Sequence, residues 1–227
     1  MDVWRYLDLA KLVSLLDTKS LFFARMDIFL DPFEGATPKG VINTLTERSL
    51  DSGIPSSLYI AQHEGMSEDF RKYTFVSCWH QSEFESEAMW QLYSDKHKGI
   101  AIVTSREKLS NVLPENIEID SVKYVDFNAD KVELTALHFY KRSAFEYEKE
   151  LRAVVIDRNN SNSGIIVNAE PNEYIEKIIV SPMAQPWFVD VVKSICTKYG
   201  CTFEVEESSL SITPSYSFEE YSYINDS

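Results

Sequence analysis

The sequence feature that most constrains the fold is a strand–helix–strand pattern late in the chain. An apolar run at residues 177–180 predicts a strand, Pro186 is typical of a first helical turn, and the periodicity that follows predicts a helix to Tyr199. Gly200 is a typical helix stop, and residues 202–205 predict a second strand. A strand, a helix and a strand in that order predict parallel strands joined by a right-handed crossover.

The rest of the chain alternates between helical and extended patterns, which predicts an α+β fold with a mixed sheet and flanking helices. Residues 9–19 carry apolar side chains at helical spacing, with Asp8 as N-cap. The other expected elements are strands at 21–24, 73–79, 99–104, 117–127, 151–156 and 165–167, and helices at 86–98, 105–113 and 128–141. We expect residues 1–213 to form one domain, with the polar segment 36–72 as a lid or insertion and residues 214–227 as a tail.

Charge and composition exclude some classes of protein. The 227 residues carry a formal net charge of −14, and a broad DNA- or RNA-binding surface needs clustered Lys and Arg, so we expect no such surface. A small cationic pocket for a nucleotide stays compatible with this charge. The apolar runs are short and the N-terminal stretch is charged, so we expect no signal peptide and no membrane span. The cysteines Cys78, Cys196 and Cys201 lack metal-ligand spacing, and together these features predict a cytoplasmic protein.

The first segment with chemical potential joins the N-terminus to a turn at residues 31–35. Arg5 and Tyr6 offer a donor fork and a hydroxyl to a phosphate or ribose if they lie at a strand edge over a pocket. The turn, with Phe33 and its neighbouring acids, would form one wall of that pocket. The alternative is that the aromatic residues are core, that Arg5 is a surface charge and that Asp31 caps the turn.

The second segment runs from the strand at residues 73–79 into the helix that follows. Ser77, at a strand end, is a candidate ribose partner. The broad aromatic face of the helix indicates core packing, which fits Trp90, whereas Tyr93 can offer a ring to a planar base and a hydroxyl to a polar group. His80 and His97 have no second histidine at ligand spacing, so we expect no zinc site.

The third segment places Glu146, Glu148 and Glu150 at every second position before a buried run. On a strand all three would share one face, so at least one would need a neighbouring cation or a raised pKa. The nearest cations in sequence are Lys141, Arg142 and Arg152. The alternative is a solvated end of a strand or helix, with the carboxylates in water.

Together these segments resemble a bacterial family called domain of unknown function 2971. The strings that carry the resemblance are WRY, IFLDPFEG, AMWQLYSDKHKG and KRSAFEYEKELR, and the similarity touches most of residues 4–210. This family brings no established activity.

The sequence is also similar, more weakly, to ADP-ribosyltransferase-like domains, which implies that fold and NAD as substrate. The resemblance implies that Arg5 or Tyr6 holds the NAD ribose, and that Tyr93 stacks on nicotinamide. It implies that Glu150 bonds the ribose 2′-hydroxyl and stabilises the cation formed as nicotinamide leaves. Glu148 would orient the acceptor, and Arg152 would brace the two carboxylates.

This chain departs from the transferase pattern in two places. Many such enzymes begin with a histidine, and none lies near Arg5. The middle motif is Val76-Ser77-Cys78 instead of Ser-Thr-Ser.

Three functional hypotheses follow. The first is an NAD-dependent ADP-ribosyltransferase or NAD glycohydrolase, acting as a toxin or phage-defence effector on nucleic acid, protein or water. The second is a non-catalytic module that binds a nucleotide or a protein partner in the same cleft. The third is a metal-dependent phosphohydrolase that uses Asp31, Glu34, Glu148 and Glu150 to hold Mg²⁺ or Mn²⁺.

Overall fold

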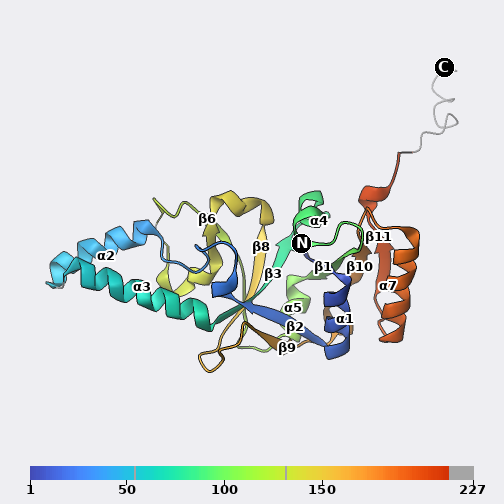
Figure 1. Ribbon diagram of the computed structural model, residues 1–227, viewed down its shortest axis with the longest axis horizontal. Coiled ribbons are helices and arrows are strands. Elements are labelled where there is room, and N and C mark those ends of the chain that lie inside the picture. Colours follow the sequence, from blue (N-terminus) through green and yellow to red (C-terminus); the bar gives the residue numbers. More distant parts are fainter. Residues whose placement is uncertain (54, 131, 215–227) are drawn as a thin grey trace, which may run out of the picture.

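The computed structural model describes residues 1–53, 55–130 and 132–214, which form an α+β fold around a nine-stranded mixed sheet (Figure 1). The described strands are β1 (Asp2–Asp8), β2 (Ser20–Arg25), β3 (Thr74–Gln81), β4 (Gly99–Ser105), β5 (Glu118–Ser121), β6 (Lys123–Val125), β7 (Tyr140–Arg142), β8 (Glu150–Ile156), β9 (Gly164–Asn168), β10 (Lys177–Val180) and β11 (Glu204–Glu207). The mixed sheet and flanking helices predicted from the sequence are confirmed.

The helices connect and cover these strands. They are α1 (Leu9–Thr18), α2 (Lys39–Ser52), α3 (Ser56–Tyr73), α4 (Glu87–Tyr93), α5 (Arg106–Val112), α6 (Pro171–Tyr174) and α7 (Pro186–Lys198), with 3-10 helices η1 (Met26–Ile28), η2 (Leu134–Phe139), η3 (Ser143–Glu148) and η4 (Ser209–Ser211).

Strand β3 is the branch point of the sheet. The main strand order is β11-β10-β4-β1-β3-β2-β9, and β8 and β5 continue from the other edge of β3. On their shared edge, β1 pairs with β3 only at His80 and Gln81, and β2 pairs with it only at Phe75 and Val76. Residues 77–79 of β3 therefore face a gap where β1 and β2 diverge.

The alternation of side chains along β1 divides the core into two sides. Val3 and Leu7 belong to the larger cluster, which α1, α5, α6 and α7 complete on one face of the sheet. Trp4 and Tyr6 point the other way and pack with Trp90 and other apolar residues near α4. Because neighbouring residues of a strand face opposite sides, Arg5 and Tyr6 enter different environments.

The C-terminal crossover predicted from the sequence is confirmed. Strands β10 and β11 are parallel, and α7, with Pro186 in its first turn, connects them. The second strand begins at Glu204, two residues later than expected. Apolar positions on α7 pack into the larger core, so burial of one helix face stabilises this unit.

The expected helix at 128–141 is wrong. The Asp126 carboxylate accepts a hydrogen bond from the Asn128 amide at 2.8 Å, and Asp130 accepts one from the Asp126 amide at 2.7 Å, so a turn forms instead. Residues 134–139 form η2, with a kink at Ala136, and β7 then pairs with β6. The expected strand at 117–127 is accordingly split into β5 and β6.

The helix expected at 86–98 ends early, at Tyr93. Its N-cap is Ser86, whose side chain accepts from the Met89 amide. Asp95 then accepts hydrogen bonds from the amides of His97 and Lys98, which forms a turn before β4. Gly99 is the first residue of that strand.

The polar segment 36–72 contains two helices. Helices α2 and α3 pack against each other and extend away from the sheet (Figure 1). At its base α3 contacts η1 and β2, and the Ser67 hydroxyl donates to the Gly35 carbonyl at 3.1 Å. Gly35 has a φ of +68°, which ends the turn that starts at Asp31. The predicted tail falls almost entirely on residues 215–227, outside the described residues.

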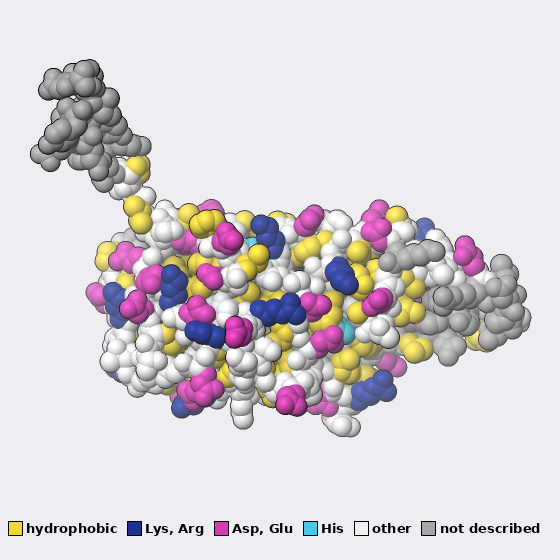
Figure 2. Space-filling model, turned by 180° about the vertical axis from the view of Figure 1, so that it is seen from behind, with side chains coloured by type: hydrophobic (Ala, Val, Ile, Leu, Met, Phe, Trp, Pro, Cys, Tyr) yellow, Lys and Arg dark blue, Asp and Glu magenta, His cyan; other side chains and the backbone are white. Residues whose placement is uncertain are grey.

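Two surface observations bear on the composition arguments. Across the described residues, no helix combines the length and the apolar character that crossing a membrane requires. On the face drawn in Figure 2, Lys and Arg side chains are interspersed with Asp and Glu and do not gather into one patch.

Candidate functional site

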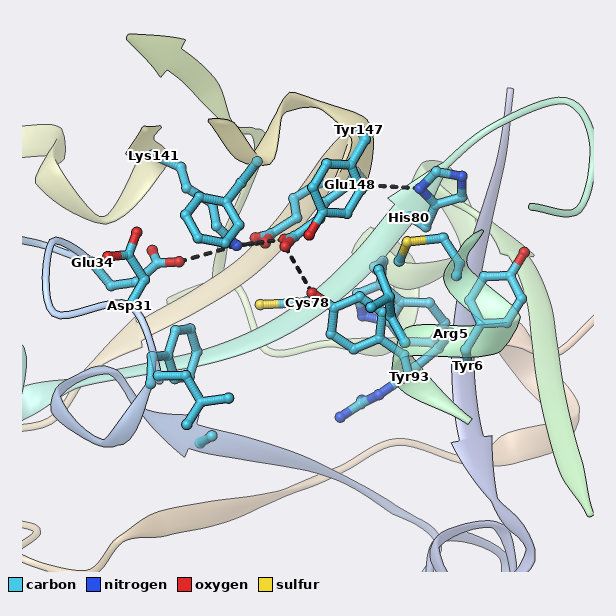
Figure 3. Close-up of a pocket in the computed structure, with 18 of the residues that line it drawn as sticks. Arg5, Tyr6, Asp31, Glu34, Cys78, His80, Tyr93, Lys141, Tyr147 and Glu148 are labelled. Atoms are coloured by element: carbon cyan, nitrogen blue, oxygen red, sulfur yellow. Dashed lines mark hydrogen bonds and ion pairs between the residues drawn. The ribbon is translucent and has the colours of Figure 1, made fainter. Parts of the chain in front are cut away.

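A cavity of about 630 Å³ lies where β1, β3, β8, α4 and η3 meet the loop that follows η1. Its size is within the range of small-molecule sites. Figure 3 shows residues from these elements pointing into one space. Among the sequence-predicted site residues, the cavity is lined by Arg5, Tyr6, Tyr93, Glu148 and Glu150. The structure therefore brings the three distant segments together.

Glu34, Glu148 and Glu150 form an acidic corner of the cavity, and a left-handed residue separates the last two. Helix η3 ends at Glu148, Lys149 adopts a φ of +41°, and β8 starts at Glu150. Glu146, Glu148 and Glu150 do not share one face of a strand, because Ser143–Glu148 forms η3 and the chain is not extended there. Glu146 is exposed, while Glu148 and Glu150 are buried.

Four of the buried charges form a closed ring. Lys141 Nζ lies 3.1 Å from Glu34 Oε1 and 2.6 Å from Glu150 Oε1. Arg152 lies 2.7 Å from Glu34 Oε2 through one terminal nitrogen and 2.6 Å from Glu150 Oε2 through Nε. Arg152 is fully buried and also donates to the His138 carbonyl. Two cations and two carboxylates thus compensate one another out of water, as buried charges require.

Glu148 is attached to this ring but is not part of it. Its Oε2 contacts Lys141 Nζ, and its Oε1 accepts a hydrogen bond of 2.7 Å from the Tyr93 hydroxyl. Its backbone carbonyl accepts a hydrogen bond of 2.6 Å from His80 Nδ1. Figure 3 shows Lys141 between Glu34 and Glu148, with Tyr93 on the other side of Glu148.

The two glutamates differ in their affinity for a proton. Burial, together with the neighbouring Glu150 carboxylate, raises the pKa of Glu148 to about 7, although Lys141 opposes the shift. Burial also disfavours the charge on Glu150, but Arg152 and Lys141 outweigh it and hold its pKa well below the usual range. Glu150 is therefore ionised at neutral pH, whereas Glu148 exchanges a proton there.

Arg5 occupies the gap where β1 and β2 diverge. Its guanidinium donates to Ser77 Oγ at 2.8 Å and to the Phe22 carbonyl at 3.1 Å, and it lies 5.4 Å from the ring centre of Trp79. Two of its donors are thus engaged by the protein at the floor of the cavity. The buried Ser77 hydroxyl also accepts from Trp79 Nε1. Ser77 does not line the cavity, so its contact near the site is with Arg5.

Tyr6 and Tyr93 line the cavity in different ways. Tyr6 is buried, its hydroxyl accepts from the Ser86 amide at 2.9 Å, and its ring packs edge-on against Trp90. Trp90 is 2% exposed, which confirms that it is a core residue. Tyr93 is 44% exposed, so its ring remains available to a ligand while its hydroxyl is bound to Glu148.

The turn at residues 31–35 contributes acids to the cavity wall. Asp31 and Glu34 line it, whereas Phe33 does not. The Phe33 ring lies 4.4 Å from the guanidinium carbon of Arg142, which makes two hydrogen bonds to Asp31. Asp31 also accepts from the Phe33 amide, so it both caps the turn and borders the cavity. Arg142 therefore pairs with this turn and not with the late glutamates.

Sequence reasoning missed two residues that border the cavity. Lys141 was expected only as one of three nearby cations, and its contacts with three carboxylates depend on a pairing between β7 and β6 that spacing does not show. His80 was considered only as a metal ligand. It lies on β3 directly opposite Trp4 of β1. This placement depends on strand pairing, which the residues next to His80 in the sequence do not indicate.

The donor set does not favour the metal hypothesis. Among the described residues, no group of three or more His, Cys, Asp or Glu side chains is arranged to hold a metal ion. The oxygens of Glu34 and Glu150 that would bind Mg²⁺ instead contact the ammonium of Lys141 and the guanidinium of Arg152. A divalent cation would have to displace both.

Comparisons with known proteins give a partial family match. No curated protein matches the sequence. Among solved structures, DarT from Thermus sp. 2.9 in complex with NAD+ is similar, with a TM-score of 0.43, 11% identity, and coverage of 93% of this chain and 97% of that one. The family model described as a protein of unknown function, DUF2971, matches residues 89–153. The resemblance to that family is thus confirmed over the part of the chain that carries Tyr93, Lys141 and both buried glutamates.

Proposed function

We propose that this protein cleaves the N-glycosidic bond of a nucleotide such as NAD and transfers the ribosyl group to water or to an acceptor. The observation that carries the proposal is a pair of carboxylates, Glu148 and Glu150, that border one cavity and whose pKa values their surroundings shift in opposite directions. Pairs of acids whose pKa values are separated by their surroundings are typical of glycosyl-transfer sites.

Glu150 supplies the permanent negative charge. As the bond from ribose C1′ to the nicotinamide nitrogen breaks, its electron pair leaves with nicotinamide and positive charge develops on C1′ and the ring oxygen. A fixed carboxylate lowers the energy of that cation and can accept a hydrogen bond from a ribose hydroxyl. Lys141 and Arg152 hold both Glu150 oxygens in place, so little reorganisation is needed.

Glu148 acts on the nucleophile. A new bond forms between C1′ and the oxygen of water or of an acceptor hydroxyl, and the proton of that oxygen passes to the Glu148 carboxylate. A general base is most effective when its pKa lies near the working pH, and the pKa of Glu148 is about 7. Tyr93 orients the same carboxylate by a 2.7 Å hydrogen bond.

The walls of the cavity suit a nucleotide. The rings of Tyr93, Phe145 and Tyr147 border it and can pack on a planar base. Arg5 places a positive charge at its floor, which favours an anionic or phosphate-bearing ligand. These features support the substrate class and leave the acceptor open.

Release of nicotinamide tests the proposal. Purified protein is incubated with NAD alone, with single-stranded nucleic acid and with a protein mixture, and free nicotinamide is measured by chromatography. We expect release by the wild type, and a loss of at least about 100-fold in Glu150→Gln. Glu146→Gln is the matched control, because Glu146 is exposed on the same segment and should leave release unchanged. No release under any of these conditions would remove the basis for this function.

A non-catalytic nucleotide sensor is the second candidate. It is favoured by one observation, the engagement of both Glu150 oxygens by protein cations. Calorimetric binding of NAD to wild type and Glu150→Gln separates the two functions. An enzyme variant should keep most of its affinity while losing turnover, whereas a sensor should bind NAD without releasing nicotinamide in either form.

A further inference from the structure

Lys141 is the shared partner of every carboxylate in the acidic corner. Its ammonium contacts Glu34, Glu148 and Glu150, which come from the 31–35 turn, η3 and β8. We propose that Lys141 is a positioning residue that opposes protonation of the Glu148 carboxylate and keeps it directed at the cavity. This inference rests on the proposed function, since it assigns how the base of that reaction is prepared.

The arrangement of charges singles out Glu148. Glu34, Lys141, Glu150 and Arg152 alternate in sign around a closed ring, so their charges balance. Glu148 is the surplus carboxylate and has no contact with Arg152 among the ion pairs of the described residues. The next proton taken up by the cluster therefore goes to Glu148, and Lys141 is the cation that opposes its uptake.

Lys141 itself is held firmly. Its side chain is 7% exposed, and its ammonium lies 4.8 Å from the ring centre of Phe145. On the neighbouring strand β6, Tyr124 pairs in register with Lys141, and the Tyr124 hydroxyl accepts from the Glu150 amide at 2.8 Å. The surrounding carboxylates outweigh burial and raise the pKa of Lys141, so the ammonium stays charged.

The other groups around Glu148 do not replace this charge. Tyr93 from α4 donates a neutral hydrogen bond, and His80 from β3 donates to the Glu148 backbone and not to its carboxylate. Burial lowers the pKa of His80, which keeps that ring neutral at pH 7. Lys149 is exposed, and Tyr147 and Tyr124 are uncharged phenols beside the cluster. Lys141 is thus the one cation in contact with the Glu148 carboxylate in the described part of the chain.

Carbon-detected NMR titration of glutamate carboxyls tests this role without any substrate. In Lys141→Met we expect the Glu148 pKa to rise from about 7 to above about 8, because a contact cation is lost. Lys141→Arg should restore it nearly to the wild-type value. Lys149→Met is the matched control, since it removes the same charge from an exposed neighbour and should shift Glu148 much less.

The wild type gives a second readout if Lys141→Met does not fold. The ¹⁵N shift of the Lys141 ammonium should change with pH at the same midpoint as the Glu148 carboxyl. Equal Glu148 titration in folded Lys141→Met and Lys149→Met, or a wild-type ammonium shift that is flat across the Glu148 midpoint, would overturn the proposal.

Nicotinamide release separates this outcome from the fate of the proposed function. If Lys141 and Glu148 titrate together but no nicotinamide is released from NAD, the role of Lys141 is supported and the proposed reaction is contradicted. Where release occurs, the acidic limb of its pH profile should move to higher pH in Lys141→Met. A purely structural lysine would lower the rate at every pH and leave the limb in place.

Discussion

The Tyr93 hydroxyl donates a 2.7 Å hydrogen bond to Glu148 Oε1 and so connects the end of α4 to the end of η3 across the cavity. The contact gives the hydroxyl and the ring of Tyr93 different surroundings. Its hydroxyl acts on a carboxylate, and its half-exposed ring remains free to contact a ligand.

Two substitutions at Tyr93 should separate these parts. Tyr93→Phe removes only the hydroxyl, so we expect NAD affinity to stay within about twofold while nicotinamide release falls about tenfold, because a hydrogen bond to a charged group is lost. Tyr93→Ala removes the ring as well and should weaken NAD binding by about 1 kcal/mol or more. Calorimetry and release assays measure both effects. Equal loss of affinity in the two variants would contradict the division.

The raised pKa of Glu148 should appear in the pH dependence of stability. Because the folded state binds this proton more tightly than the unfolded state, stability is lost as pH rises through the window from the ordinary value of 4.5 to about 7. Glu148→Gln cannot titrate, so it should gain stability relative to wild type across that window, on the order of 3 kcal/mol. Urea unfolding at pH 5 and pH 8 measures the difference. A constant difference at the two pH values would show that Glu148 does not titrate there.

Individual elements show why part of the fold was predictable. Asp8, Ser86 and the first-turn Pro186 act through local geometry, and each begins a helix where the sequence indicated. The turn at Asp126 was missed because its side chain competes for backbone amides that a helix would use. A sequence pattern predicts a helix less reliably where side-chain oxygens compete with the helix for the same backbone amides.

The membership of the candidate site was predictable only in part, and its geometry was not predictable. Tyr93, Glu148 and Glu150 were identified from their chemistry. The left-handed conformation of Lys149, which turns both glutamates inward, could not be predicted, because glycine is the usual sequence signal for that conformation and the residue is a lysine. The contacts of Lys141 depend on strand pairing, and those of Arg5 on a gap between β1 and β2. Such long-range contacts are set by the packed fold, and the periodicity of the sequence does not predict them.

Arg152 should be among the most sensitive positions for stability. It is fully buried between Glu34 and Glu150, so Arg152→Met leaves two carboxylates without that cation. We expect a loss of about 3–5 kcal/mol in the free energy of unfolding, measured in urea at pH 7. Lys11 pairs with Asp8 at the surface, and Lys11→Met should leave the midpoint unchanged. A similarly small effect in Arg152→Met would mean that the ring is dispensable for folding.

Ser77 should act on the cavity through Arg5. Its hydroxyl accepts from the Arg5 guanidinium at 2.8 Å and from Trp79 Nε1 at 3.1 Å, and Ser77→Ala leaves both donors without that acceptor. We expect a loss of about 1–3 kcal/mol in stability. NAD affinity should also fall, since a guanidinium released from Ser77 no longer holds its charge at the cavity floor. Ser77→Thr keeps the acceptor and should recover both properties. If Ser77→Ala binds NAD with full affinity below its unfolding temperature, Arg5 does not need the hydrogen bond to Ser77 to contact NAD.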